Sequence, residues 1–201
     1  MGKIIGITGG IASGKSTVTN FLREKGFQVV DAGAFVHQLQ KPGGRLYQLL
    51  VQHFGQEIIL ENGELNRPLL ASLIFSNPEE REWSKQTQGE IIREELAALR
   101  DQLTQTEAIF FMDIPLLFEQ DYVNWFDETW LVYVDRDVQV ERFMKRDHLS
   151  KEVAESRLAA QWSLEEKKKL ASHILDNNGS RDQLVAQVVR LLEGGDSCAR
   201  D

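Results

Sequence analysis

The chain has 201 residues, of which 42% are hydrophobic, enough to bury a full core as one domain with a small insertion. Its net charge of −8 argues against a nucleic-acid surface, because such surfaces are generally basic. The single cysteine, Cys198, excludes an internal disulfide, and no apolar stretch approaches membrane length. We therefore expect a soluble, cytoplasmic protein that is a monomer or a weak homo-oligomer, with no nucleic-acid or membrane partner.

The first predicted element is a buried strand, Lys3–Thr8, which leads directly into residues 9–16, Gly-Gly-Ile-Ala-Ser-Gly-Lys-Ser. These residues match the phosphate-binding loop G-x-x-x-x-G-K-[ST], a motif that requires a strand before it and a helix after it. The apolar face shared by Val18 and Leu22 predicts such a helix, beginning near Lys15. The sequence therefore predicts a nucleoside triphosphate site at this strand–loop–helix unit.

Each position of the loop has a chemical role in this prediction. Gly9 and Gly14 permit the backbone angles that turn successive N–H groups toward phosphate oxygens. Lys15 should reach the β- and γ-phosphates, and the Ser16 hydroxyl should bind Mg²⁺. Because no Asn-Lys-x-Asp guanine motif is present, ATP is the expected nucleotide. The residues expected to bind it in this segment are Gly9, Gly10, Ile11, Ala12, Ser13, Gly14, Lys15, Ser16 and Thr17.

Strand-like and helix-like segments alternate downstream, which favours an α/β fold with a parallel sheet. The further strands are predicted at Phe27–Asp31, Ala108–Asp113, Thr129–Asp135 and His173–Asp176. Between the first two of these, helices are predicted at Arg45–Phe54, at Pro68–Phe75 and from Pro78 to about Leu103. A crossover connection needs far less chain than this, so we expect an inserted helical subdomain. A kinase could build its acceptor pocket there.

Two of the predicted strands end in a carboxylate. Asp113 closes the apolar run 109–112, which has the form of a Walker-B element that holds Mg²⁺. Asp31 closes another strand, and parallel-sheet proteins bind ligands beyond the carboxyl ends of their strands. The alternative for each aspartate is a cap at the strand end.

Four arginines fall within residues 136–157, and Arg142 and Arg146 share one helix face because they are four residues apart. Guanidinium groups bind phosphate bidentately and stabilise the charge on a transferring phosphoryl group. The alternative is a helix with surface ion pairs, since acidic residues such as Asp147 lie close in sequence. The basic run Lys167–Lys169 is expected to be a solvated helix face.

Several motifs, in this order and at these spacings, resemble the dephospho-CoA kinase family. They are Ile5–Ser16, Val30-Asp31-Ala32, Asp113-Ile-Pro-Leu-Leu-Phe-Glu119, Arg142 with Arg146-Asp147, and Asp176-Asn177-Asn178-Gly179. The similarity runs from about residue 3 to residue 193. Such kinases phosphorylate the ribose 3′-hydroxyl of dephospho-CoA with ATP and Mg²⁺, completing coenzyme A. The resemblance implies the same reaction here, with ATP and dephospho-CoA as the small-molecule partners.

The resemblance also implies a P-loop NTPase fold in a single kinase domain over residues 1–201. Its core would comprise residues 1–32, 104–140 and 171–193, with a helical acceptor-binding insertion over 33–103 and a helical lid over 141–170. Thr8 would contact phosphates, and Asp113 with Ser16 would hold the metal. The catalytic residues would be Asp31 beside the acceptor hydroxyl, Lys15, and Arg142 and Arg146 in the lid; Asn177, Asn178 and Gly179 would lie near the adenine.

The chain departs from the family pattern at two places. The family usually reads Asp-Ala-Asp after its second strand, whereas this chain reads Asp31-Ala32-Gly33, and Gln88-Gly89 stands where the family often has His-Pro. General base catalysis contributes about 10²–10⁴ in rate, so the missing carboxylate predicts an active but impaired kinase with Asp31 as the base. Two alternatives stay open: a nucleotide-binding protein without transfer activity, and a kinase for another small metabolite.

Overall fold

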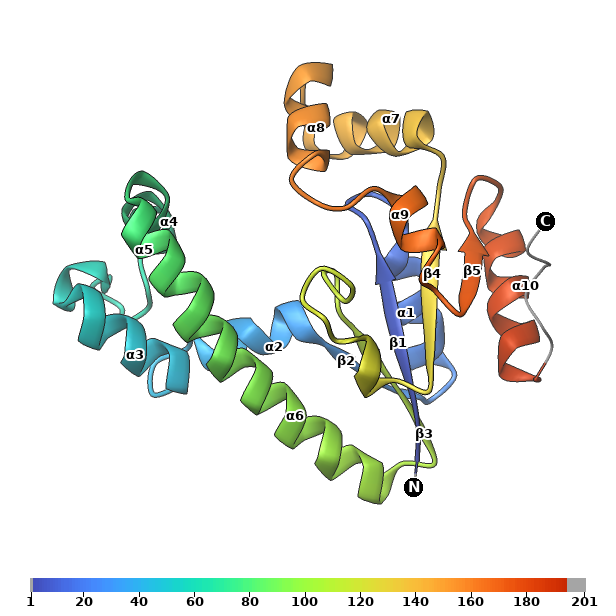
Figure 1. Ribbon diagram of the computed structural model, residues 1–201, viewed down its shortest axis with the longest axis horizontal. Coiled ribbons are helices and arrows are strands. Elements are labelled where there is room, and N and C mark those ends of the chain that lie inside the picture. The colour runs from blue at the N-terminus through green and yellow to red at the C-terminus, as the bar shows by residue number, and fades with distance from the viewer. Residues whose placement is uncertain (1, 195–201) are drawn as a thin grey trace. The chain divides into compact units, whose positions relative to one another are not determined.

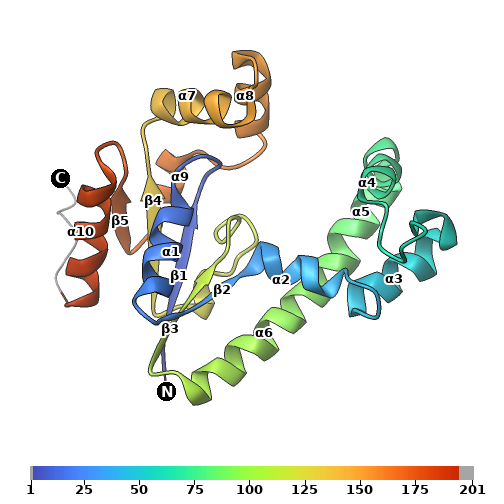
Figure 2. The same ribbon diagram turned by 180° about the vertical axis from the view of Figure 1, so that it is seen from behind.

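The computed structural model describes residues 2–194, which contain a five-stranded parallel sheet flanked by helices (Figure 1, Figure 2). The strands are β1 (Lys3–Gly9), β2 (Gln28–Asp31), β3 (Ile109–Asp113), β4 (Glu128–Tyr133) and β5 (His173–Asp176). Their order across the sheet is β2-β3-β1-β4-β5, and every neighbouring pair is parallel. The predicted α/β fold of the P-loop NTPase class is confirmed, and all five predicted strands are present.

The main core lies between one face of this sheet and two helices, α1 (Lys15–Glu24) and α10 (Arg181–Leu192). Ile5 and Ile7 of the central strand are fully buried there, because alternate residues of a strand point to the same face. They pack in one cluster with Leu22 of α1 and with residues of α10. Each such side chain contributes about 1.5–3 kcal/mol on burial. The strand that precedes the phosphate-binding loop is therefore rigidly held.

Three helices lie between β4 and β5: α7 (Arg136–Asp147), α8 (Lys151–Leu158) and α9 (Leu164–Lys168). Serine residues cap the N-termini of α8 and α9. The Ser150 hydroxyl accepts a hydrogen bond from Val153 N, and Ser163 forms a capping box with Glu166. The helices α7 and α8 share a small apolar cluster of Val140, Phe143, Ala154 and Leu158, against which Ile11 and Ala12 of the loop also pack. This cluster joins the loop to α7.

The described chain divides into two compact units. The first comprises residues 2–31 and 104–194 and carries the sheet, and the second comprises residues 32–103. Most of the second unit is helical, with α2 (Ala32–Leu39), α3 (Arg45–Phe54), α4 (Arg67–Ser76), α5 (Pro78–Trp83), a π-helical segment Ser84–Gln88 and α6 (Gly89–Thr106). Short 3₁₀ turns occur at Gln56–Ile58 in this unit and at Val123–Trp125 in the first. A separate core of Leu50, Ile58, Leu65 and Leu70 stabilises the second unit.

The long helix predicted from Pro78 to about Leu103 differs from the structure in its middle and at its end. A π-helical segment interrupts it, inside which Gln88 Nε2 donates to Ser84 Oγ at 2.5 Å, and α6 continues to Thr106. Hydrophobic periodicity does not reveal such a segment, because one widened turn keeps the chain helical. Within residues 2–194, no helix is both long and apolar enough to cross a membrane.

Candidate functional site

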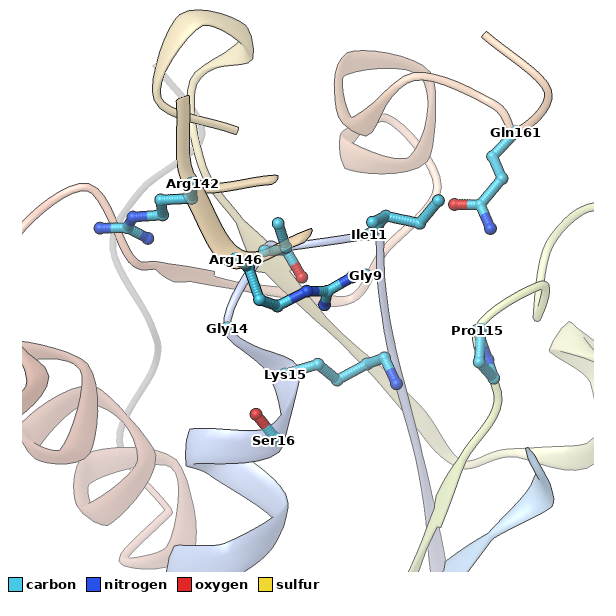
Figure 3. Close-up of a pocket in the computed structure, with 12 residues that line it drawn as sticks. Gly9, Ile11, Gly14, Lys15, Ser16, Pro115, Arg142, Arg146 and Gln161 are labelled. Carbon is cyan, nitrogen blue, oxygen red and sulfur yellow. The ribbon is translucent and has the colours of Figure 1, made fainter. Parts of the chain in front are cut away.

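A pocket of about 630 Å³ opens where the phosphate-binding loop joins β1 to α1 (Figure 3). Its walls come from the loop, from the segment after β3, from α7 and from the segment that precedes α9. The lining residues are Gly9, Gly10, Ile11, Ala12, Ser13, Gly14, Lys15, Ser16, Pro115, Arg142, Arg146 and Gln161. All of them belong to the unit that carries the sheet. The pocket thus lies beyond the carboxyl end of the central strand, where parallel sheets bind ligands.

The loop has the backbone geometry that its glycines predict. Gly14 has a φ of +91°, and a Cβ at this position would lie 2.0 Å from Asn177 Nδ2. Ala12 also has a positive φ of 59°, which a residue with a side chain rarely adopts. Ser13 N donates to Gly10 O at 3.2 Å, which closes the turn. The loop therefore encloses the pocket with backbone that only glycine can provide at position 14.

Asn177 supports the loop from the end of β5. Its side chain is buried, and Nδ2 donates to the backbone oxygen of Ser13 at 2.8 Å. The neighbouring Asn178 accepts a hydrogen bond from Asp135 N at 2.9 Å. Asn178 and Gly179 line a separate, smaller pocket of about 470 Å³ with residues of α10. Of the three residues expected near the adenine, Asn177 thus contacts the loop directly, and an adenine contact for all three stays a prediction.

Lys15 and Asp113 form an ion pair beside the pocket. Lys15 Nζ donates to Asp113 Oδ1, and both side chains are largely buried. Burial raises the pKa of the Asp113 carboxyl, and the charge of Asp31 acts in the same direction, whereas Lys15 opposes the shift. The strand register pairs Asp31 with Asp113 at the ends of β2 and β3. Two carboxylates predicted separately from the sequence therefore lie at adjacent strand ends, and Lys15 at the start of α1 contacts one of them.

The donor set suits one Mg²⁺ ion held jointly with phosphate oxygens. Mg²⁺ takes oxygen ligands and usually keeps several waters, with only one or two protein carboxylates. Asp113 supplies a carboxylate, and Ser16 supplies a hydroxyl on the first turn of α1. No cluster of three or more His, Cys, Asp or Glu residues that could hold a metal alone occurs within residues 2–194.

Arg142 and Arg146 both line the pocket from α7, but their side chains take different directions. Figure 3 shows that Arg146 reaches across the loop above Lys15, whereas Arg142 points away from it. Two hydrogen bonds, at 2.6 and 3.0 Å, join Arg146 to Asp147. The hydrogen bonds that Arg146 donates to Asp147 raise the pKa of its guanidinium. Arg146 therefore has both the reach and the permanent charge to bind a phosphate.

The two threonines of the predicted set do not line the pocket. Thr8 is fully buried, and its hydroxyl donates to Pro115 O at 3.1 Å. Thr17 lies on α1, where its backbone N–H donates to Gly14 O at 3.0 Å. Both support the walls of the pocket in this structure, and their direct contact with nucleotide stays a prediction.

Sequence reasoning missed several residues of the site. Pro115 and Gln161 line the pocket, and Gln139 Nε2 donates to the loop oxygen Ile11 O at 2.8 Å. Pro115 belongs to the motif 113–119, in which no role was assigned to it. No sequence signal marks Gln139 or Gln161, because they act through tertiary contacts between distant segments. The expected solvated face over Lys167–Lys169 is wrong for Lys167, whose side chain is fully buried. Lys168 and Lys169 are exposed, as expected.

Comparison with known proteins assigns the family. Residues 3–183 match the family model described as dephospho-CoA kinase. The dephospho-CoA kinase of Streptococcus pneumoniae serotype 4 is 82% identical over the whole of both chains. The dephospho-CoA kinase of Streptococcus mutans is 57% identical, with 94% of this chain and 95% of the relative covered.

Solved structures agree with this assignment. The protein TT1252 of Thermus thermophilus has 33% identity and a TM-score of 0.78, with 96% of this chain and 97% of that chain covered. The dephospho-CoA kinase of Campylobacter jejuni has 27% identity and a TM-score of 0.73, with coverages of 96% and 99%. The sequence, the loop geometry and these matches lead to one conclusion: the chain belongs to the dephospho-CoA kinase family.

Proposed function

We propose that this chain transfers the γ-phosphoryl group of ATP to the ribose 3′-hydroxyl of dephospho-CoA, giving coenzyme A and ADP. As a member of its family, the chain is an ATP-dependent phosphotransferase. The observation that carries the proposal is the ion pair between Asp113 and Lys15, a residue that lines the pocket walled by the phosphate-binding loop. The proposal includes Mg²⁺ as the metal, the cytoplasm as the compartment, and a monomer or weak homo-oligomer as the active form.

The nucleotide side of the site uses the loop and its two polar side chains. Backbone N–H groups of residues 10–16 bind the phosphate oxygens, and the positive end of the α1 dipole faces the same charge. Lys15 exchanges its contact with Asp113 for the β- and γ-phosphates. Ser16 and Asp113 hold Mg²⁺, which when bound neutralises charge on the phosphate oxygens. Thr8 and Thr17 support this binding surface, and Asn177, Asn178 and Gly179 lie toward the adenine.

The acceptor side of the reaction centres on Asp31. Its carboxylate is exposed at the end of β2, whereas the paired Asp113 is buried. Asp31 accepts the proton of the ribose 3′-hydroxyl as that oxygen bonds to the γ-phosphorus. The bond between the γ-phosphorus and the β–γ bridging oxygen breaks, and ADP leaves with the electron pair. Residues 33–103 form the acceptor-binding part in this proposal.

Residues 141–170 act as a lid over the phosphates. Arg142 and Arg146 lie on α7, and the proposed closure brings their guanidinium groups onto the transferring phosphoryl oxygens. Closure also excludes water, which competes with the ribose hydroxyl as an acceptor. The position of Arg146 above Lys15 supports this role (Figure 3).

Gly33 favours a second candidate, a nucleotide-binding protein with impaired or lost transfer activity. The family usually has an aspartate at this position, and a missing general base would cost about 10²–10⁴ in rate. Phosphoryl transfer depends mainly on positioning and electrostatics, so Asp31 alone leaves room for a slow enzyme. A kinase for another small metabolite would share the nucleotide site and differ only in the acceptor.

The experiment that tests the proposal measures transfer of labelled γ-phosphate from Mg·ATP to dephospho-CoA, with Gly33→Asp beside the unaltered chain. Turnover by the unaltered chain supports the proposed function. A higher rate in the Gly33→Asp variant would mean that the missing carboxylate limits the rate of the unaltered chain. Activity in the variant alone supports the second candidate. Tight ATP binding with no transfer by either protein would overturn the assignment of dephospho-CoA as acceptor, and competition assays with other alcohols would follow.

A further inference from the structure

Lys167 is a fully buried lysine near the pocket beside the phosphate-binding loop, called the phosphate pocket below. Its side chain has 0% exposure, and Nζ lies 2.8 Å from Glu119 Oε1 and 3.0 Å from Pro115 O. Lysine is almost never fully buried unless a partner compensates its charge. The neighbouring Lys168, on the same short helix, and Lys169, at its C-cap, are exposed. Lys167 is therefore placed by specific contacts rather than by general helix packing.

The contacts of Lys167 join three segments that are distant in sequence. Pro115 O accepts from both Lys167 and Thr8 Oγ1, which connects the segment after β3 to the end of β1. Glu119 Oε1 accepts from both Lys167 and the backbone N–H of Trp162, at 3.3 Å for the second bond. These five residues form the Lys167 cluster.

Each joined segment also supplies part of the phosphate pocket. Gly9 follows Thr8, Pro115 itself lines the pocket, and Gln161 precedes Trp162. The Lys167 cluster thus fixes the backbone on three sides of the pocket at once. A shift of this cluster would move the pocket walls together with the base of the proposed lid.

Stability alone does not account for such a cluster. A buried ion pair contributes little net stability, and well-packed apolar side chains of similar volume often replace one without loss. Glu119 Oε2 is moreover buried with no hydrogen-bond partner among the described residues, an arrangement that opposes stability. Apolar side chains cannot provide the directional hydrogen bonds that this cluster makes to Pro115 O and to the Trp162 N–H.

We propose that Lys167 is a positioning residue for phosphoryl transfer, acting with Glu119 to hold Pro115 and Gln161 in the geometry that the transferring phosphate requires. This inference rests on the proposed function. Misplacement of a reacting group by about 1 Å can cost on the order of 10²-fold in rate. The cluster therefore affects the chemical step although it makes no contact with the reacting atoms.

The decisive variant is the double substitution Lys167→Met with Glu119→Leu, which removes both charges and keeps the volumes similar. Each single substitution leaves one buried charge without its partner, so both singles should melt at a lower temperature. The double variant should regain most of that loss, because no unpaired charge remains. Its kcat at saturating ATP and dephospho-CoA should nevertheless stay at least about tenfold below that of the unaltered chain. The matched control is Lys169→Met, an exposed change two residues away.

A double variant that melts normally and keeps kcat within about twofold of the unaltered value overturns the positioning role. If the double variant does not fold, Thr8→Val decides, because it removes one bond to Pro115 O at nearly constant volume. Its dissociation constant for Mg·ATP is measured beside kcat, and an unchanged constant excludes the loss of a direct nucleotide contact. A kcat lowered about threefold with unchanged stability then supports the role, and an unchanged kcat overturns it.

A binding measurement distinguishes failure of the positioning role from failure of the proposed function. If the unaltered chain does not phosphorylate dephospho-CoA, the same variants are compared by the dissociation constant of Mg·ATP, which involves no acceptor. A constant raised in the double variant but not in Lys169→Met supports the positioning of the pocket walls. An unchanged constant overturns it.

Discussion

Asp31 and Asp113 occupy paired positions at the carboxyl ends of the adjacent parallel strands β2 and β3. Their surroundings differ, since Asp113 is buried and bound to Lys15, whereas Asp31 is exposed. Burial and the nearby charge of Asp31 raise the pKa of Asp113. This difference suggests separate roles, with the buried carboxylate toward the metal and the exposed one toward the acceptor.

Asp31→Asn should lower kcat by about 10²–10⁴-fold, because the amide cannot accept the hydroxyl proton. The dissociation constant of Mg·ATP should change little, since Asp31 does not line the phosphate pocket. Steady-state kinetics with dephospho-CoA, together with calorimetric titration of nucleotide, checks both parts. An unchanged rate would remove Asp31 from the mechanism.

Arg146→Ala should lower kcat by about 10²-fold, because a guanidinium that stabilises transition-state charge is lost. Arg142→Ala should cost less in this assay, since its side chain points away from Lys15 (Figure 3). The two variants are compared at saturating substrates. A larger loss for Arg142→Ala than for Arg146→Ala would mean that closure brings Arg142, rather than Arg146, against the transferring phosphoryl group.

Gly14→Ala should abolish tight ATP binding, because the added Cβ would approach Asn177 Nδ2 to 2.0 Å and φ is +91°. Gly26→Ala is the matched control, since Gly26 has a similar φ of +87° but open space around it. The control should lose about 1 kcal/mol of stability and keep its nucleotide affinity. Nucleotide titration and thermal melting separate the two effects, and equal affinities in both variants would contradict the argument.

Tyr133 gives a prediction on alkaline stability. Its partly buried hydroxyl bonds to Asp135 and Glu165, and burial together with these carboxylates raises the pKa of the phenol. Because the folded-state pKa is raised above about 10, the stabilising contribution is complete below that pH. It is lost as the pH rises through the folded-state value.

Tyr133→Phe should therefore lower the free energy of unfolding by about 1–2 kcal/mol at neutral pH. The difference between the variant and the unaltered chain should shrink in strongly alkaline solution. Urea unfolding at pH 7 and at increasing alkaline pH measures this difference. A difference that stays constant across the series would mean that the hydroxyl acts only through packing.

Part of this protein follows from local sequence. The phosphate-binding loop requires glycine at fixed spacing, so its position and the strand and helix around it could be read directly from residues 3–22. The five strands were predictable because each is a short apolar run bounded by turn residues. The helix Arg45–Phe54 was predicted at its observed bounds for the same reason, a sustained periodic pattern. The π-helical segment was not, since it leaves no periodic signature.

The remaining features depend on which segments meet in space. Lys167 illustrates this, because its sequence neighbours are two other lysines and the run reads as solvated. Only the fold brings Glu119 and Pro115, from a segment after β3, within hydrogen-bond distance of it. Pro115, Gln139 and Gln161 joined the site in the same way, by tertiary contacts that composition and spacing do not encode.

The sequence by itself thus determined the nucleotide-binding loop, the parallel α/β fold and the resemblance to a kinase family, since these depend on residue types at fixed local spacing. The tertiary structure alone decided which side chains line the pocket beside the loop and which lysine is buried. The physical reason is that burial and charge pairing depend on neighbours distant in the chain, whereas backbone conformation and hydrophobic periodicity are local properties.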